Sequence, residues 1–364
     1  MVSVNILRII DKYFVKFGLF CIYPFRKKSN CSNKKVLVVR LWGLGDSINT
    51  LPLIDSLYNN GFEVDILTTS NVKFIFEKQK FINNLILFDF SKPFSFFSMI
   101  KLLNKNNYEI IIDTEQFMNV STFIISLVTS SLKIGFDLPF RKKFYNLSYD
   151  YSEKNHLVEN FSKLLTNFNL NKIPSKLLPI VYSKSSILNI DKLLLKCGNK
   201  KLVGIHLGTA GTALGRRWDE NKFVDLINKL DDVCIILTGS KFEEKIFNKI
   251  SSKIENKNVI NLINKTSLRD FACLLGRLDV FVSNDTGAMH ISAAMSCMTV
   301  GLFGMNSPVK VGAWPLSENI NIFKNPNNNS IINNKYSIYP KDYDSTIDLI
   351  SVDEVFDAVR GVLK

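Results

Sequence analysis

The sequence predicts an α/β protein with two lobes, each built on a mostly parallel sheet. Three observations lead to this prediction. The chain has 364 residues, whereas a single core stops growing at roughly 250 to 300 residues. Short apolar runs alternate with helix-like stretches, as in βαβ units whose strands are buried on both faces. The alternation lapses once, between residues 169 and 200, and then resumes.

The expected strands fall into two series. The first reads KVLVVRLW, FEVDILTT, NLILFDF, YEIIIDTE and LKIGF, and the second reads KLVGIHLG, DVCIILTGS, NVINLIN, DVFVSND and TVGLFG. The stretch between them contains Pro174, Pro179 and many lysines and serines, which is typical of an interdomain region. The chain ends in an amphipathic helix pattern with Ser351 as the expected N-cap.

These patterns predict five segments. They are a basic amphipathic N-terminal segment (1–33), a first α/β domain (34–170), an interdomain region (171–200), a second α/β domain (201–345) and a C-terminal helix (346–364).

The positive charge is concentrated at the N-terminus. The formal net charge is +13, and residues 1–35 hold eight basic residues against Asp11 alone, a net +7. Such a cluster can attract nucleic acid or an anionic membrane, but it lacks the motifs of a nucleic-acid-binding module. The alternative is a solvated basic leader.

The first residues also form an amphipathic helix pattern. Charged residues interrupt it, so it is too short to span a bilayer. The expected polar face holds Arg8, Asp11, Lys12 and Lys16, and the expected apolar face holds Ile6, Ile9, Ile10, Tyr13, Phe14 and Phe17. Two interpretations remain: a helix lying in a membrane interface, or one packed on the protein itself.

The six cysteines, at positions 21, 31, 197, 234, 273 and 297, include no CxxC pair and no metal-ligand spacing. We therefore expect reduced core residues in a cytoplasmic protein.

Ligands of open parallel sheets bind at the carboxyl ends of the strands, and three such junctions are rich in polar residues. In the first, RLWGLGDSINTLP, Gly43 and Gly45 allow a sharp turn next to a ligand and Asp46 begins a helix. Asp46 is either a helix cap or a catalytic carboxylate. A dinucleotide site with Glu63 or Asp65 is a weaker alternative, because the third glycine of the fingerprint is missing.

The second junction, GIHLGTAGTALGRRWDENKF, combines hydroxyl groups and arginines. Thr209, Thr212, Arg216 and Arg217 suit a diphosphate, since arginine binds phosphate oxygens through two N–H groups. The alternative is a flexible surface loop.

The third junction, FVSNDTGAMHISAAMS, delivers polar residues to a helix start, where unpaired amides favour an anion. The candidates are Asp285, Thr286, Gly287 and His290, although a lone histidine is more often structural.

These three segments, in this order, resemble glycosyltransferase family 9, the ADP-heptose:lipopolysaccharide heptosyltransferases and their relatives. The resemblance covers residues 34 to 316 and includes the runs D-T-G-x-x-H and T-V-x-L-F-G. It implies a GT-B fold of two Rossmann-like lobes facing across a cleft, with the acceptor on the first lobe and the nucleotide sugar on the second.

The resemblance also implies an inverting transfer without a metal or another cofactor. Asp46 would be the general base, Arg216 would bind the donor diphosphate where relatives often have lysine, and the 285–290 residues would hold donor phosphate and nucleotide. Glu243 or Glu244 would meet the ribose. The pair Asp342 and Asp344 lies in a late loop and is not expected to bind a metal.

The acceptor would be a lipopolysaccharide or another lipid-linked glycan at the inner face of the cytoplasmic membrane, so we expect a peripheral protein on an anionic membrane. Arg141, Lys142, Lys143 and His156 could contact acceptor phosphates, or form a solvated basic loop. The alternatives are a transferase using another nucleotide sugar, a nicotinamide-dependent oxidoreductase, or a non-catalytic nucleotide-sugar-binding protein.

Overall fold

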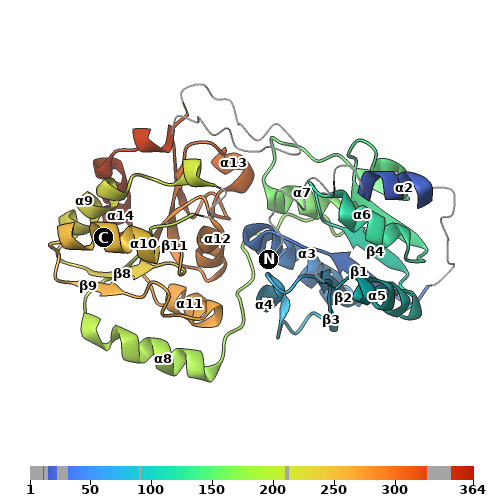
Figure 1. Ribbon diagram of the computed structural model, residues 1–364, viewed down its shortest axis with the longest axis horizontal. Coiled ribbons are helices and arrows are strands. Elements are labelled where there is room, and N and C mark those ends of the chain that lie inside the picture. Colours follow the sequence, from blue (N-terminus) through green and yellow to red (C-terminus); the bar gives the residue numbers. More distant parts are fainter. Residues whose placement is uncertain (1–10, 12–14, 23–31, 90–91, 210–212, 326–345) are drawn as a thin grey trace. The chain divides into compact units, whose positions relative to one another are not determined.

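The computed structural model describes residues 11, 15–22, 32–89, 92–209, 213–325 and 346–364. The chain divides into two compact units, Met1–Pro174 and Ser175–Lys364 (Figure 1). Their boundary falls inside the predicted interdomain region. Within the described residues each unit has one sheet of six strands, and all neighbouring strands are parallel. The predicted α/β fold with two parallel sheets is confirmed.

The sheet of the first unit has the strand order β3-β2-β1-β4-β5-β6. Its strands are β1 (Lys35–Val39), β2 (Glu63–Thr68), β3 (Asn84–Leu87), β4 (Ile110–Asp113), β5 (Leu132–Phe136) and β6 (Leu147–Tyr149). Its helices are α2 (Lys16–Ile22), α3 (Leu44–Asn59), α4 (Lys73–Phe76), α5 (Pro93–Lys105), α6 (Asn119–Ser126), α7 (Leu157–Lys163) and the 3-10 turns η3 (Lys142–Phe144) and η4 (Thr166–Phe168).

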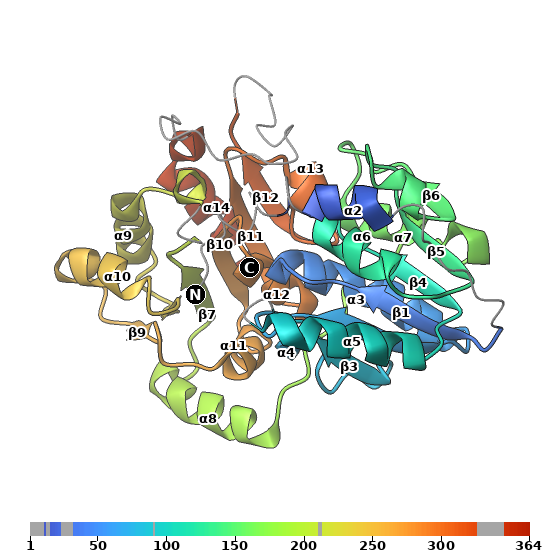
Figure 2. The same cartoon turned by 45° about the vertical axis from the view of Figure 1, so that its right-hand side comes forward.

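Helices α5 and α6 cover the centre of this sheet. Leu103 of α5 and Ile124 of α6 are buried in the same apolar cluster as Val39 of β1. Helix α2 packs on α6, so α2, α6 and α5 lie along one side of the unit (Figure 2).

The described residues of the N-terminal segment include one that is buried against the rest of the first unit. Asp11 is buried, and its carboxylate accepts the backbone N–H groups of Asn119 and Val120 at 2.9 and 2.8 Å. Both residues begin α6, whose unpaired amides favour a carboxylate. Phe17, in contrast, is 69% exposed. The predicted faces are therefore wrong for Asp11 and Phe17.

The other residues of the predicted apolar face, together with Arg8 and Lys12, lie outside the described residues. In the part of the chain that the structure describes, no helix is both long and apolar enough to cross a membrane.

The sheet of the second unit has the strand order β12-β11-β10-β7-β8-β9. Its strands are β7 (Leu202–His206), β8 (Cys234–Thr238), β9 (Val259–Asn261), β10 (Val280–Asn284), β11 (Met298–Phe303) and β12 (Ile320–Phe323). Its helices are α8 (Lys184–Leu194), α9 (Glu220–Lys229), α10 (Glu244–Ile250), α11 (Leu268–Leu275), α12 (Gly287–Ala294), α13 (Pro308–Val311) and α14 (Val352–Leu363), and its 3-10 turns are η5 (Leu195–Cys197), η6 (Leu214–Arg216), η7 (Ser251–Lys253) and η8 (Thr346–Leu349).

The first and last helices of this unit pack on other helices of the same unit. Helix α8, from the predicted interdomain region, packs on α11, and the C-terminal helix α14 packs on α9. Ser351 is the N-cap of α14 and forms a capping box with Glu354, as predicted.

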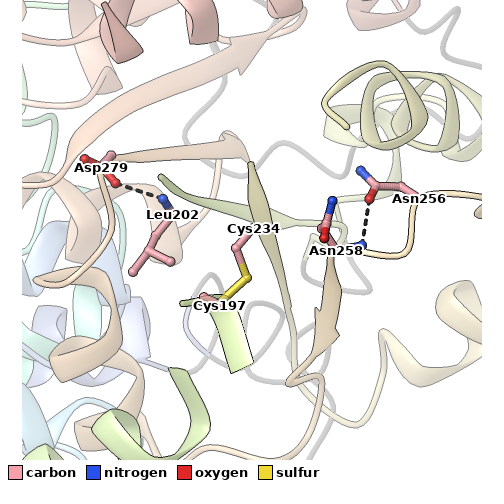
Figure 3. The surroundings of a disulfide bond; sticks show 6 residues. All are labelled: Cys197, Leu202, Cys234, Asn256, Asn258 and Asp279. Carbon is pink, nitrogen blue, oxygen red and sulfur yellow. Dashed lines mark hydrogen bonds between the residues drawn. A yellow bond between two sulfur atoms is a disulfide. The ribbon is translucent and has the colours of Figure 1, made fainter. Parts of the chain in front are cut away.

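One disulfide overturns the prediction that all cysteines are reduced. Cys197, at the end of η5, is bonded to Cys234, which begins β8, with 5.5 Å between their Cα atoms (Figure 3). Local pattern does not predict this pair, because the two cysteines are 37 residues apart and meet only when the chain after α8 returns beside the sheet. Cys273 and Cys297 are free and buried, as predicted, whereas Cys31 and the side chain of Cys21 lie outside the described residues.

Candidate functional site

The first predicted junction joins β1 to α3. Gly43 is the N-cap of α3 with φ +79°, a left-handed conformation that favours glycine, and Asp46 lies in the first turn of the helix. Asp46 is therefore not the N-cap. A Cβ atom at Gly43 would lie 2.8 Å from Oδ2 of Asp46, so this glycine also makes room for the carboxylate. Gly45 is the second residue of the helix.

A buried arginine holds the Asp46 carboxylate in place. Nη2 of Arg40 lies 2.7 Å from Oδ2 of Asp46, and Nε2 of Gln116 donates to the same oxygen at 3.2 Å. The Arg40 side chain is 1% exposed and that of Asp46 is 24% exposed. The ion pair thus has a buried cation and a carboxylate that solvent reaches.

The residues that follow β4, the strand next to β1, supply further contacts of this arginine. Arg40 donates through Nη1 to the Thr114 carbonyl and to Oε1 of Gln116, both at 2.9 Å. Glu115 lies 3.6 Å from its Nε and accepts the backbone N–H groups of Leu41 and Trp42. Burial raises the pKa of Glu115. These contacts fix the loop between β1 and α3, directly before the helical turn that contains Asp46.

Sequence reasoning missed Arg40, Glu115 and Gln116. A signal for them was present: a basic residue ends the first strand, and the polar run DTEQ ends the strand beside it. Since the carboxyl ends of neighbouring parallel strands meet at one edge, these residues could have been paired.

The predicted acceptor residues of the first unit all have contacts within the protein. Arg141 is buried and ion-paired with Asp113 at 3.0 Å. Lys142 is exposed and paired with Asp137 at 2.7 Å. His156 is buried as the N-cap of α7, where its ring accepts the Val158 N–H. Arg141 and His156 therefore stabilise the fold, and neither forms the solvated loop considered from the sequence.

In the second unit, three strand ends converge on one carboxylate. Asp285 follows β10; its Oδ2 lies 3.3 Å from Nη1 of Arg216, in the loop after β7, and accepts a hydrogen bond from the amide of Asn306, after β11. The Asp285 side chain is 7% exposed and that of Arg216 is 21% exposed. The structure thus brings together two residues predicted from separate motifs and adds Asn306, which sequence reasoning missed.

The backbone of this site is held by Asn284. Its side-chain oxygen accepts the Trp218 N–H at 3.0 Å, and its amide donates to the Gly208 carbonyl at 3.1 Å. Thr286 is the N-cap of α12, whose first residue is Gly287, and its side chain makes no capping hydrogen bond among the described residues. The first amides of α12 thus remain available to an anion. His290 is buried in the same helix.

A second polar cluster surrounds Glu243, after β8. Glu243 is buried, and its carboxylate accepts the backbone N–H and the hydroxyl of Ser240, both at 2.6 Å. A Cβ atom at Gly208 or Gly239 would overlap the Glu243 side chain, so both glycines are needed for its position. Glu244, the alternative considered from the sequence, instead accepts a hydrogen bond from Asn264.

Three more polar residues lie at or after the carboxyl ends of the strands in the second unit. Thr209 is buried, and within the described residues its hydroxyl has no hydrogen-bond partner. Burial lowers the pKa of Arg217, and Glu243 opposes the shift. Burial also lowers the pKa of His206, at the end of β7, to about 4, again opposed by Glu243. Sequence reasoning missed His206. Thr212, Asp342 and Asp344 lie outside the described residues.

The fold defines the class of protein. The glycosyl transferase family 9 structure from Veillonella parvula superposes with a TM-score of 0.79 and 17% identity, over 93% of this chain and 99% of that one. Escherichia coli heptosyltransferase WaaC, solved with ADP, superposes with a TM-score of 0.67 and 19% identity, over 90% of this chain and 99% of that one. The chain therefore has the GT-B fold of these proteins.

Sequence comparison gives the family. The model of glycosyltransferase family 9 (heptosyltransferase) matches residues 96–341, and the chain belongs to this family. Lipooligosaccharide heptosyltransferase 2 of Campylobacter jejuni is 26% identical over 199 residues, 53% of this chain and 58% of the relative. Lipopolysaccharide heptosyltransferase 1 of Campylobacter coli is 25% identical over 303 residues, 74% of this chain and 84% of the relative. The chain thus spans little more than half of the first of these relatives.

Proposed function

We propose that the protein is an inverting, metal-independent glycosyltransferase that moves heptose from ADP-heptose to a lipopolysaccharide or related surface glycan. We further propose that it works in the cytoplasm as a peripheral protein of the inner membrane face. Family membership supports the reaction class. The names of the relatives and the ADP in the Escherichia coli structure support the acceptor and the nucleotide.

In this proposal the first unit activates the acceptor. Asp46 takes the proton from the attacking hydroxyl group, which then displaces the nucleoside diphosphate through an oxocarbenium-like transition state. Arg40 and Gln116 both donate to Oδ2, so we assign proton transfer to Oδ1. These donors would keep the carboxylate in one orientation throughout the reaction.

The second unit binds the donor and stabilises its leaving group. Negative charge builds up on the diphosphate as the glycosidic bond breaks, and positive groups aimed at it lower the barrier. Arg216 and the first amides of α12, at Gly287, would supply this charge, with Arg217 beside them. Thr209 would donate its hydroxyl group, and Glu243 would bind the ribose hydroxyls. Asp285 and Asn306 would orient Arg216.

The single observation that carries this proposal is the partly exposed Asp46 carboxylate fixed by a buried arginine. The test is to incubate the full chain with ADP-heptose and heptose-free lipopolysaccharide in detergent, and to measure ADP release and the anomeric form of the product. We expect acceptor-dependent ADP release, an inverted anomeric centre and full activity in EDTA.

Other outcomes would replace the proposal. Donor binding without ADP release would indicate a non-catalytic binding protein, and turnover with a different nucleotide sugar would change the substrate. Retained stereochemistry would exclude direct displacement.

A further inference from the structure

Two helices of the first unit expose large apolar side chains. Phe17 of α2 is 69% exposed, Phe97 of α5 is 73% exposed and Leu102 of α5 is 46% exposed. Single apolar residues on a surface need no explanation, but a group of them marks an interaction site.

The two helices that carry these residues lie on one side of the unit. The Phe96 ring of α5 stacks on the Phe123 ring of α6 at 6.0 Å, and Gly18 of α2 lies against the same Phe123 ring. Helix α6 thus lies between α2 and α5 (Figure 2). The α2/α5 face is defined by the exposed apolar and basic residues of the two helices, which are Lys16, Phe17, Phe97, Lys101, Leu102 and Lys105.

The charge of this face has one sign. The sequences of α2, KFGLFCI, and α5, PFSFFSMIKLLNK, contain lysines and no acidic residue. The surface helices of the second unit differ: α9 and α14 contain acidic as well as basic residues. The Nζ atoms of Lys16 and Lys143 lie 5.2 and 4.4 Å from the centre of the Phe140 ring, which adds cationic groups beside α2.

We infer that the α2/α5 face docks on an anionic lipid surface. Exposed phenylalanine and leucine side chains can enter the boundary between headgroups and acyl chains, while lysine stems run along the apolar surface and their ammonium groups meet lipid phosphates. Charge complementarity favours this occupant over a second copy of the chain, because two such faces would bring lysines together. The inference rests on the proposed function in one respect: docking on the membrane would bring the protein close to the lipid-linked acceptor.

The test measures vesicle binding under conditions in which no sugar transfer can occur. The full chain is sedimented with phosphatidylcholine vesicles that contain or lack phosphatidylglycerol, without donor or acceptor. Point variants are preferable to removal of residues 1–30, because truncation would delete the buried Asp11 and Leu19. The variant is Phe97→Gln with Lys101→Gln.

A matched pair on the second unit provides the control. Leu188 is 71% exposed on α8, and Lys192 follows it one helical turn later. Leu188→Gln with Lys192→Gln therefore removes a similar apolar and basic pair from a different surface. Circular dichroism melting curves establish that both variants remain folded.

We expect the wild type and the control to bind vesicles containing phosphatidylglycerol, and the α2/α5 variant to bind at least about tenfold more weakly, since it loses one apolar anchor and one lysine near a charged surface. The inference would be overturned if all three proteins bound equally well, or if the wild type did not bind vesicles. It would also be overturned if the wild type bound vesicles with and without phosphatidylglycerol equally well. Concentration-dependent dimerisation that only the α2/α5 variant lacks would overturn it as well.

Transfer to a detergent-dispersed acceptor separates this inference from the proposed function. A protein that transfers sugar but ignores vesicles contradicts only the docking face. A protein that binds vesicles through the α2/α5 face but transfers nothing contradicts only the reaction.

Discussion

Arg40 and Asp46 form an ion pair in which Nη2 and Oδ2 are 2.7 Å apart, six residues from each other along the chain. Arg40 has other carbonyl and carboxylate partners in the interior, whereas Asp46 is partly exposed. We therefore propose that Arg40 is the positioning residue and that Asp46 is the group that contacts substrate.

Replacing Arg40 should reduce turnover more than donor binding. For Arg40→Met we expect kcat to fall about 100-fold, because a displaced catalytic group costs that much, with an unchanged donor Kd. Leaving Glu115 without its cation should also lower the free energy of unfolding by about 3 to 5 kcal/mol. Arg40→Lys should recover part of both. Kinetics and calorimetry check this; unchanged kcat in a folded Arg40→Met protein would remove the positioning role.

Gly43 and Gly61 offer a matched comparison, since both have φ +79°. Alanine at either position should cost about 1 kcal/mol of stability, because a side chain disfavours this conformation. Only at Gly43 would the new Cβ lie 2.8 Å from Oδ2 of Asp46. Chemical denaturation should therefore give similar losses, while transfer assays should show a loss for Gly43→Ala alone. Equal activities would mean that the turn does not position Asp46.

Arg216 should control donor affinity. For Arg216→Ala we expect the Kd for ADP-heptose to rise about 10- to 100-fold, the contribution of a charge-assisted hydrogen bond. Arg277→Ala is the control, because Arg277 pairs with Asp191 at 3.2 Å on a different part of the second unit. Calorimetric titration measures both, and a normal Kd for Arg216→Ala would exclude it from the diphosphate site.

His206 should make stability depend on pH. Burial lowers its pKa to about 4 from an ordinary 6.5, so the folded protein binds fewer protons than the unfolded chain between these values. The contribution of His206 to the free energy of unfolding, about 3 kcal/mol, is then complete above pH 6.5 and is lost as the pH drops toward 4. His206→Gln should flatten this slope in urea titrations. Identical slopes for both proteins would assign the acid sensitivity to other groups.

The main features of the site could be predicted because each lies directly after an apolar strand. Asp46 and the 285–290 residues follow strands whose carboxyl ends face ligands in parallel sheets, so local pattern sufficed. The predicted donor carboxylate and arginine are indeed ion-paired in the second unit.

The supporting residues depend on long-range contacts that local pattern does not encode. From the sequence, Arg40 is only a residue near the end of a predicted strand. Its role depends on Gln116, which lies 76 residues later in the chain and accepts a hydrogen bond from it. Asp11 looked like the solvated side of a helix because the amides of Asn119 and Val120, which bury it, lie 108 and 109 residues away. The same holds for the disulfide, whose cysteines have no motif.

The most direct test of the account is the donor affinity and turnover of Asp46→Asn, which keeps the size of the side chain and removes its basicity. General-base catalysis contributes about 10²- to 10⁴-fold, so we expect kcat to fall by that factor while the Kd for ADP-heptose, measured by titration calorimetry, stays at the wild-type value. A variant with wild-type kcat would show that another group accepts the proton and would contradict the central claim.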